Sequence, residues 1–464
     1  MSSGASYVNR VALIAALGGF LMGFDASVIS GVVGFIETEF ALSKFELGWA
    51  VASLTLTSTI AMMLAGPLSD RLGRRPVLMI AALLFTLSAA ASAVAPDYAT
   101  LVTARLLGGF GVGAALIVAP MYIAEIAPPA IRGRLVSFNQ LNIVLGISAA
   151  YFCNYLILQL GQDPGSLAQA LGLDTFTWRW MLGVGTLPAL VYMVVLFFVP
   201  ESPRWLLMRG RDSQARKVFG RCVGEMLAGA QVREVQASLA LEAGRPRGTL
   251  RELASPALKL VMTVGIAIAI LQQITGINAV FFYAPMIFEQ SGIGADASFM
   301  QAVLVGIVNL VFTIAAMLLI DRLGRRPLMI AGLALIAACM LLLAWGFSAA
   351  EPRPLVILIG MLGFVAGFAM SLGPVMWVLL SELFPNRVRG LAISACGLIN
   401  STISFVVQLV FPWELQVLGS ATTFLVYGVF AVIGLVFVVR VLPETRGRSL
   451  EELEVELASA PRQA

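Results

Sequence analysis

The stretch "DRLGRRP" runs from Asp70 to Pro76 and occurs again, identical in all seven residues, from Asp321 to Pro327. A second pair of similar segments follows in each case: "YIAEIAPPAIRG" begins at Tyr122, and "LLSELFPNRVRG" begins at Leu379. The first pair is offset by 251 residues and the second by 257. Matching segments in the same order at nearly the same offset predict two related halves in parallel.

The composition indicates what kind of halves these are. Hydrophobic residues make up 59% of the 464 residues, charged residues 12%, and the mean hydropathy is +0.91. A soluble domain carries about 25% charged residues, and a soluble fold of this composition would expose large apolar patches. Twelve apolar runs have the length of a membrane span, near 11–34, 47–69, 77–95, 101–123, 137–160, 180–199, 257–283, 298–320, 328–348, 355–381, 390–412 and 421–442. The sequence therefore predicts an all-α membrane protein with twelve transmembrane helices in two six-helix bundles.

Polar segments divide the chain further. We predict an N-terminal six-helix bundle at 1–199, a cytoplasmic helical linker at 200–256, a C-terminal six-helix bundle at 257–442 and a cytoplasmic tail at 443–464. The linker begins with "PESPRWLL", which places Ser202 as an N-cap and Pro203 at the first helical position. The tail contains "PETRGRSLEELEVEL" and is expected to form one more amphipathic helix.

The positive charges predict the orientation of the chain. If the N-terminus is cytoplasmic, the outer loops hold only Lys44, Arg179 and Arg353, and Arg105 falls inside a span. The other 26 of the 30 Lys and Arg residues then lie on the cytoplasmic side, an asymmetry that places both termini in the cytoplasm. Because the cations follow the loops, the net charge of +4 does not indicate binding to nucleic acid.

Several kinds of site are not expected from the residues present. The chain has no histidine, so a group that titrates near neutral pH must be a carboxylate with a shifted pKa. None of the four cysteines lies in a CxxC pair, so we expect no disulfide and no metal. No phosphate loop of the GxxxxGK[ST] form occurs, so ATP is not expected to drive the protein. No cofactor and no enzymatic reaction are predicted.

One carboxylate lies within the first span, in "LMGFDASVISG" from Leu21 to Gly31. A charged side chain near the centre of a spanning helix costs roughly 2.5–3.5 kcal/mol, so Asp25 needs a partner. Arg105 is the only Lys or Arg well inside a span. At about 1.5 Å per residue, the two residues lie roughly 9 Å and 6 Å from the outer boundary of a core about 30 Å thick.

This similar depth predicts that Asp25 and Arg105 pair. Asp25 would then be ionised beside the guanidinium and would take up a proton when Arg105 moves away, as a proton-coupled carrier requires. The alternative is a static ion pair that joins two helices, although a buried pair adds little stability.

Uncharged amides gather in the seventh span, which reads "AILQQITGINAVFFYAP" and contains Gln272, Gln273 and Asn278. Amides both donate and accept hydrogen bonds, which suits neutral ligands that are rich in hydroxyl groups. On an unbroken helix Gln273 and Asn278 would point about 140° apart. Convergence on one ligand therefore requires a break near Gly276, or a ligand that is wrapped; alternatively, the amides only join helices. The further candidates are Gln140, Asn309 and Asn400, and Trp377, whose ring can cover a sugar face.

The repeated loops carry acids as well as cations. Orientation requires only Lys or Arg, so the recurrence of carboxylates predicts ion pairs that close the cytoplasmic side of the protein. The alternative is that the cations only anchor the orientation. The residues of the predicted cytoplasmic gate are Asp70, Arg74, Glu125, Arg132, Asp321, Arg325, Glu382 and Arg389.

These motifs resemble the sugar porter family of the major facilitator superfamily. The resemblance rests on "GFDASVISG", "GRRP" after the second and eighth spans, "RLLGGFGVG", "PESPRWLL", "QQITGINAVFFYAP", "GPVMWVLLSELFP" and "PETRGRSLEE". The matching segments run from the first span to the tail, so the likeness covers essentially the whole chain. It implies two six-helix bundles around a central cavity that work by alternating access.

The resemblance also implies roles for single residues. Proton-coupled members have an acid at the position of Asp25 and a cation at that of Arg105, whereas facilitative members typically have Asn at the first. An outer-gate aromatic would fall on Tyr283. The sugar contacts would fall on Gln140, Gln272, Gln273, Asn278, Asn309, Trp377 and Asn400.

Two departures from the family pattern concern the sugar that is preferred. Many relatives have Trp directly after the residue that matches Asn400, where this chain has Ser401. Many have two tyrosines at the seventh-span gate, where this chain has Phe282 before Tyr283. The loss of a ring and of a hydrogen-bond donor can enlarge the cavity, so a pentose, a hexose and a cyclic polyol all remain candidates for the substrate.

Together these features predict a secondary active transporter that imports a neutral monosaccharide with a proton across a bacterial inner membrane. Its partners are the sugar, protons and membrane lipid, and the protein is expected to be monomeric. Two alternatives are a facilitative uniporter on the same fold and a membrane sugar sensor that does not transport. The tail of 22 residues after Leu442 is short for a sensor. A drug/proton antiporter would fit the fold but not the amides.

Overall fold

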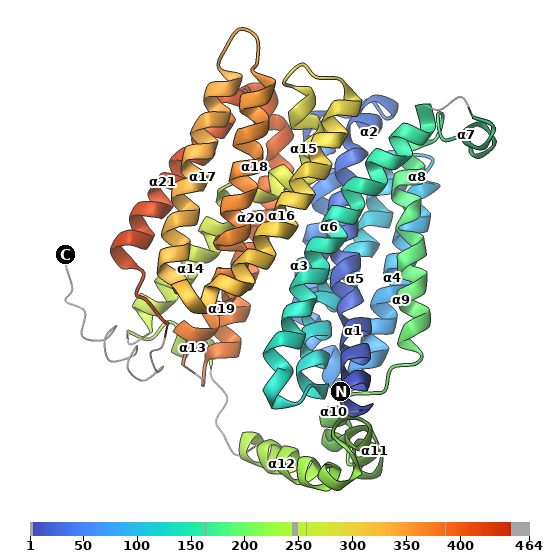
Figure 1. Ribbon diagram of the computed structural model, residues 1–464, viewed down its shortest axis with the longest axis vertical. Helices are drawn as coiled ribbons and strands as arrows, with labels where there is room; N and C mark the ends of the chain where they lie inside the picture. The colour runs from blue at the N-terminus through green and yellow to red at the C-terminus, as the bar shows by residue number, and fades with distance from the viewer. Residues whose placement is uncertain (1–2, 163–164, 244–248, 257, 386, 447–464) are drawn as a thin grey trace. The chain divides into compact units, whose positions relative to one another are not determined.

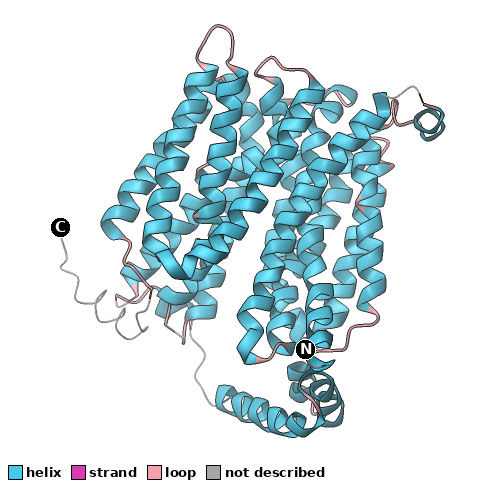
Figure 2. Cartoon of the chain, in the orientation of Figure 1, coloured by secondary structure: helices cyan, strands magenta, loops and turns pink. Residues whose placement is uncertain are grey.

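The computed structural model describes residues 3–162, 165–243, 249–256, 258–385 and 387–446. All regular structure in these residues is helical (Figure 1, Figure 2). Twelve helical segments are long and apolar enough to cross a membrane, as the sequence predicts, so the protein is a multi-pass membrane protein. The first of them begins at Gly4 rather than near Val11.

The spanning segments consist of single helices or of two helices in series. In chain order they are α1 with η1 (Ser3–Val28, Ile29–Gly31), α3 (Lys44–Leu72), α4 (Arg74–Ala93), α5 (Tyr98–Ile126), α6 (Arg132–Gln162), α8 with α9 (Thr177–Val184, Thr186–Leu196), α14 with α15 (Lys259–Ile274, Ile277–Glu289), α16 (Ala295–Leu323), α17 (Arg325–Phe347), α18 with α19 (Pro354–Met370, Leu372–Leu383), α20 (Arg389–Val417) and α21 (Ser420–Val441). The shorter helices are α2 (Val33–Glu39), η2 (Pro129–Ile131), α7 (Ser166–Leu171), α10 (Pro203–Met208), α11 (Asp212–Val223), α12 (Glu225–Ala243) and α13 (Leu250–Leu253).

The chain divides into two compact units. Unit 1 comprises residues 1–35 and 53–246, and unit 2 comprises residues 36–52 and 247–464. The first turns of α3 therefore belong to unit 2, where the ring of Trp49 meets the ring of Phe405 on α20 edge to face at 6.0 Å. The rest of α3 belongs to unit 1.

Glycines hold the helices of unit 1 in backbone contact. A Cβ atom at Gly23 of α1 would lie 1.9 Å from the carbonyl oxygen of Ile143 on α6, and one at Gly146 of α6 would lie 2.1 Å from that of Phe20. On α5, a Cβ atom at Gly109 would lie 2.1 Å from the hydroxyl of Thr57 on α3. Small residues allow this approach because helices in a membrane associate mainly through close packing. The packing fixes α1 and α5, which carry the two charges within the spans.

Three of the spans in the described residues are interrupted between two α-helices. The α8–α9 span breaks at Gly185, the α14–α15 span at Gly276 and the α18–α19 span at Ser371. Gly276 has a φ of 90°, a conformation that glycine adopts without a steric penalty. The break that the amide spacing requires near Gly276 is thus present. Within α15 the chain bends again at Tyr283, whose φ of −131° is not helical.

Short helices follow the last span of unit 1, in the segment where the sequence predicts the linker. Ser202 is the N-cap of α10, where its hydroxyl accepts a hydrogen bond from the Trp205 backbone N–H at 3.2 Å, and Pro203 is the first helical residue. Cys222 on α11 is buried, and burial raises the pKa of its thiol to about 12. The amphipathic helix predicted in the tail falls mainly on residues 447–464, which lie outside the described residues.

Candidate functional site

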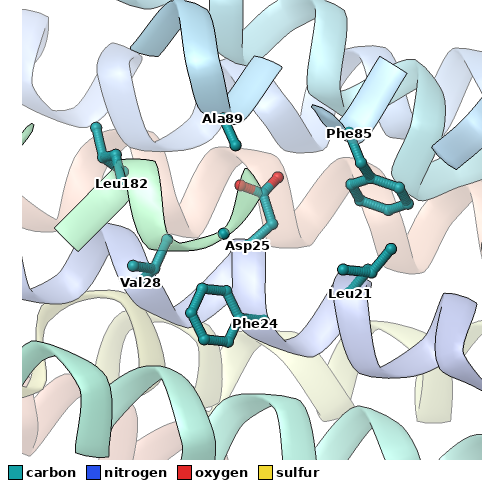
Figure 3. A pocket seen from close by; sticks show the side chains of 8 residues that line it. Leu21, Phe24, Asp25, Val28, Phe85, Ala89 and Leu182 are labelled. Atoms are coloured by element: carbon teal, nitrogen blue, oxygen red, sulfur yellow. The ribbon is translucent and has the colours of Figure 1, made fainter. Parts of the chain in front are cut away.

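Asp25 lies on α1, and its carboxylate points toward α4 beside the break between α8 and α9 (Figure 3). It faces a small pocket whose other lining residues are apolar. They come from three neighbouring segments and are Leu21, Phe24 and Val28 of α1, Phe85 and Ala89 of α4, and Leu182 and Gly185 at the break. The carboxylate is thus set in apolar surroundings where its charged form is poorly solvated.

Arg105 on α5 is the charge that faces this carboxylate. Its side chain is buried, with 1% of the residue exposed, and it interacts electrostatically with Asp25. One turn further along α5, a Cβ atom at Gly108 would lie 3.5 Å from Oδ2 of Asp25. Oδ2 is buried and accepts no hydrogen bond from the described residues. The structure therefore places the two charges within electrostatic reach, while one carboxylate oxygen has no partner in the described chain.

In unit 2, amides from three helices bond directly to one another. Nδ2 of Asn278 on α15 donates to Oε1 of Gln273 on α14 at 2.7 Å. Nε2 of Gln273 donates to Oδ1 of Asn400 on α20 at 3.1 Å. Nδ2 of Asn400 in turn donates to Oε1 of Gln272 at 2.7 Å. The break at Gly276 thus brings Gln273 and Asn278 together, and we call these four residues the amide network.

Two residues on α20 extend the amide network, and the sequence analysis did not select them. Ser404 accepts hydrogen bonds from Nδ2 of Asn278 at 2.5 Å and from Nε2 of Gln408 at 2.8 Å. The backbone carbonyl of Gln408 accepts a hydrogen bond from the buried Tyr283 hydroxyl at 2.8 Å. The signal was the spacing of Asn400, Ser404 and Gln408, because residues four apart share one face of a helix.

The other three candidates of the sugar site lie apart from these bonds. Asn309 is buried on α16, and Gln140 is half-buried on α6 of unit 1. Trp377 on α19 is 40% exposed, and the edge of its ring lies about 3.7 Å from where a Cβ atom at Gly397 of α20 would be. In the described part of the chain, none of the three forms a hydrogen bond with the amide network.

The first repeated loop closes on itself within unit 1. Arg74 begins α4 and binds Glu125 of α5 through two nitrogens, Nε to Oε2 at 2.9 Å and NH2 to Oε1 at 2.8 Å. Its third nitrogen, NH1, contacts Oδ1 of Asp70 at 2.9 Å. The Ser202 hydroxyl donates to Oε2 of Glu125 at 2.5 Å. This bidentate geometry is the strongest form of a guanidinium–carboxylate contact.

The second repeated loop makes the same contacts within unit 2. Arg325 binds Glu382 through Nε at 3.1 Å and NH2 at 2.8 Å, and NH2 also lies 3.1 Å from Oδ1 of Asp321. The Thr445 hydroxyl donates to Oε2 of Glu382 at 2.6 Å, as Ser202 does for Glu125. The repeat in the sequence is therefore a repeat in side-chain geometry.

Two acids of these clusters were missed in the sequence. The Glu201 carboxylate accepts hydrogen bonds from the backbone N–H groups of Arg74 and Arg75 at 3.0 and 3.3 Å, and so caps α4. Glu444 caps α17 in the same way. Burial raises the pKa of Glu201, while the backbone hydrogen bonds oppose this rise. The signal was the tripeptide "PES" at 200–202, which returns as "PET" at 443–445.

The last two predicted gate residues are placed differently. Arg132 is exposed at the first turn of α6. Nε of Arg389 donates to the Phe384 carbonyl at 3.0 Å. Within the described ranges neither residue forms an ion pair with a carboxylate.

Comparisons with known proteins agree with this arrangement. The family model described as "Sugar (and other) transporter" matches residues 11–457. The arabinose-proton symporter of Bacillus subtilis (strain 168) is 38% identical over 453 residues, which cover 98% of this chain and 96% of that protein. The D-xylose-proton symporter of Escherichia coli (strain K12) is 38% identical over 482 residues, which cover 97% and 96%.

A solved structure shows the same fold. The xylose transporter XylE from E. coli, in an inward open conformation, superposes with a TM-score of 0.84 at 36% identity and covers 97% of this chain and 99% of its own. The prediction of twelve transmembrane helices in the major facilitator fold is therefore confirmed.

Proposed function

The chain belongs to the family of sugar transporters, and from this premise we propose that it imports a neutral monosaccharide together with a proton. The observation that carries the proposal is the Asp25 carboxylate, which lies in apolar surroundings on α1 within electrostatic reach of Arg105. An intramembrane acid with these surroundings exists either as an ion beside the guanidinium or as a neutral acid. Alternation between the two forms lets the protein carry one proton in each cycle.

The amide network is the proposed sugar site. Its four residues present both donors and acceptors and carry no charge, which matches a neutral ligand with several hydroxyl groups. The half-exposed ring of Trp377 can stack on the apolar face of a sugar. Asn309 and Gln140 complete the set by resemblance to the family. The related symporters for arabinose and xylose favour a pentose as the substrate.

The orientation and the gate are also part of the proposal. The excess of Lys and Arg in the loops that carry Asp70 and Asp321 supports a cytoplasmic location for both termini. The bacterial symporters to which the chain is similar support the inner membrane of a bacterium. The ion pairs of Arg74 and Arg325 would then lie at the cytoplasmic end of each unit. We infer that the formation and breaking of these ion pairs changes the relative populations of the inward-open and outward-open conformations.

Transport by purified protein in proteoliposomes tests this function. We expect arabinose, xylose or glucose to be accumulated against its gradient when the outside is acidic, and sugar addition without an imposed gradient to make the medium more alkaline. Sugar uptake without any change in pH would identify a uniporter. Sugar binding without counterflow of labelled sugar would identify a sensor.

The amide network predicts a loss of affinity when Gln273 is truncated. We expect Gln273→Ala to weaken sugar binding by about 1–3 kcal/mol, because a bound sugar hydroxyl would lose the amide donor or acceptor that Gln273 offers and would be left without a partner. Isothermal titration or competition counterflow measures the affinity. Gln290→Ala removes an exposed amide at the end of the same span and should bind as the wild type does. Equal affinities in the two variants would contradict the amide site.

A further inference from the structure

Arg105 is not among the residues that line the pocket faced by Asp25. The lining residues come from α1, from α4 and from the break between α8 and α9 (Figure 3). All of these helices belong to unit 1, and none of them carries a residue of the amide network.

Small residues create the space on the pocket side. A Cβ atom at Gly185 would lie 3.4 Å from the Phe24 ring and 3.7 Å from the Cβ atom of Ala89, which are ordinary contacts. Toward the end of α4 the helices are in close contact instead, because a Cβ atom at Gly183 would lie only 3.2 Å from that of Ala93. Larger side chains at these positions would fill the space beside the carboxylate. As it stands, the pocket accommodates roughly one water molecule.

The carboxylate itself gives this space a chemical role. Oδ2 of Asp25 is buried and has no hydrogen-bond donor in the described residues. A buried carboxylate oxygen without a donor is strongly unfavourable, and a bridging water is the usual partner of such an atom. The nearby Ser88 hydroxyl points at Gly108, at 2.4 Å from where a Cβ atom there would be. A water that binds Oδ2 thus donates its hydrogen bond to a charged acceptor, and Ser88 lies near the same glycine of α5 as Oδ2 does.

We propose that this pocket is the site through which water delivers protons to Asp25 and removes them. The inference rests on the proposed proton coupling and adds a route to it. A hydronium ion in the pocket gives its proton to Oδ2 and becomes water, which leaves the neutral acid; the release of the proton to water reverses the step. The charged group that acts on Asp25 is Arg105, and the lining residues that α4 and the break between α8 and α9 contribute are apolar.

Filling the pocket tests the route. We expect Ala89→Leu, which places an isopropyl group in the pocket, to slow proton uptake on sugar addition by about tenfold, the effect of one lost hydrogen-bonding partner at a buried charge. Counterflow of sugar at equal pH on both sides should be unchanged, because exchange does not require release of the proton. Ala90→Leu adds the same group on the exposed face of α4 and should behave as the wild type.

The outcomes separate the route from the function. If the wild type shows no proton uptake on sugar addition, the proposed function fails. If the wild type takes up protons and Ala89→Leu does so equally fast, the function stands and the route is wrong. A loss of counterflow in Ala89→Leu would indicate damage to the fold. In that case thiol labelling at position 89 decides whether water reaches the pocket.

Labelling measures access to the pocket directly. Ala89→Cys and Ala90→Cys are made in a chain whose four native cysteines, Cys153, Cys222, Cys339 and Cys396, are replaced by Ser. A small charged thiosulfonate reacts only with a thiol that water reaches, because the thiolate is the nucleophile. We expect the thiol introduced at 89 to react and the one at 90, which faces lipid, to remain unlabelled. An unreactive thiol at 89 would overturn the proposal.

Discussion

Asp25→Asn should abolish uphill accumulation of sugar while leaving exchange of sugar across the membrane intact. The amide has nearly the shape of the carboxyl group, so the packing of α1 against α4 and α5 is preserved. The amide cannot bind and release a proton in the physiological pH range, so the proton gradient can no longer drive sugar accumulation. The measurement compares accumulation driven by a pH gradient with counterflow at equal pH in the same proteoliposomes.

Two further samples make this result specific to the proton. Asp25→Glu retains a titratable group in the pocket and should keep part of the accumulation. Wild-type protein treated with a protonophore should lose accumulation and keep exchange, as Asp25→Asn does. Normal accumulation by Asp25→Asn would contradict the coupling role and leave Asp25 as a structural residue that joins α1 to its neighbours.

Arg74→Ala should lower the free energy of unfolding by about 3–5 kcal/mol. The side chains of Arg74 and Glu125 are only 4% and 9% exposed, and removal of one member of a buried pair leaves the other charge without compensation. The variant also loses the hydrogen bond from NH1 to the Ser69 carbonyl at the end of α3. Unfolding by denaturant in detergent micelles gives the change in free energy.

The equivalent pair in unit 2 supplies a graded comparison. Arg325 and Glu382 are 11% and 29% exposed, so solvent compensates part of the loss and Arg325→Ala should have a smaller effect. Arg71 is exposed in the same loop as Arg74, and Arg71→Ala should change the stability by about 0.5 kcal/mol or less. Similar losses in Arg71→Ala and Arg74→Ala would show that burial of the pair is not the cause.

Much of the fold could be predicted from the sequence, because a bilayer restricts the choices. A run of apolar residues must form a spanning helix, since its backbone groups have no other partners in lipid. The duplication of "DRLGRRP" then predicted the two halves. The break at Gly276 was one of the alternatives that the sequence offered, because Gln273 and Asn278 point apart on a continuous helix, and the structure shows it.

Other features left weaker signals. The pocket beside Asp25 is lined by ordinary apolar residues such as Phe85 and Leu182, and nothing in their pattern distinguishes them from lipid-facing or core residues. The break at Gly185 lies in an apolar run, and Pro188, three residues further on, lacks the N–H that would bond to the Val184 carbonyl. The capping roles of Glu201 and Glu444 depend on contacts with helices more than a hundred residues away. Only comparison of the two halves in the sequence could have indicated them.

If the amide network is the sugar site, as we propose, it has a consequence for how tightly a sugar is held. Without ligand, Gln273, Asn278 and Asn400 already saturate much of one another's bonding capacity. An arriving hydroxyl group therefore exchanges one hydrogen bond for another, and the net gain from each exchange is small. Such a site binds the sugar weakly and releases it on the opposite side of the membrane without a large barrier, which favours rapid turnover over tight binding.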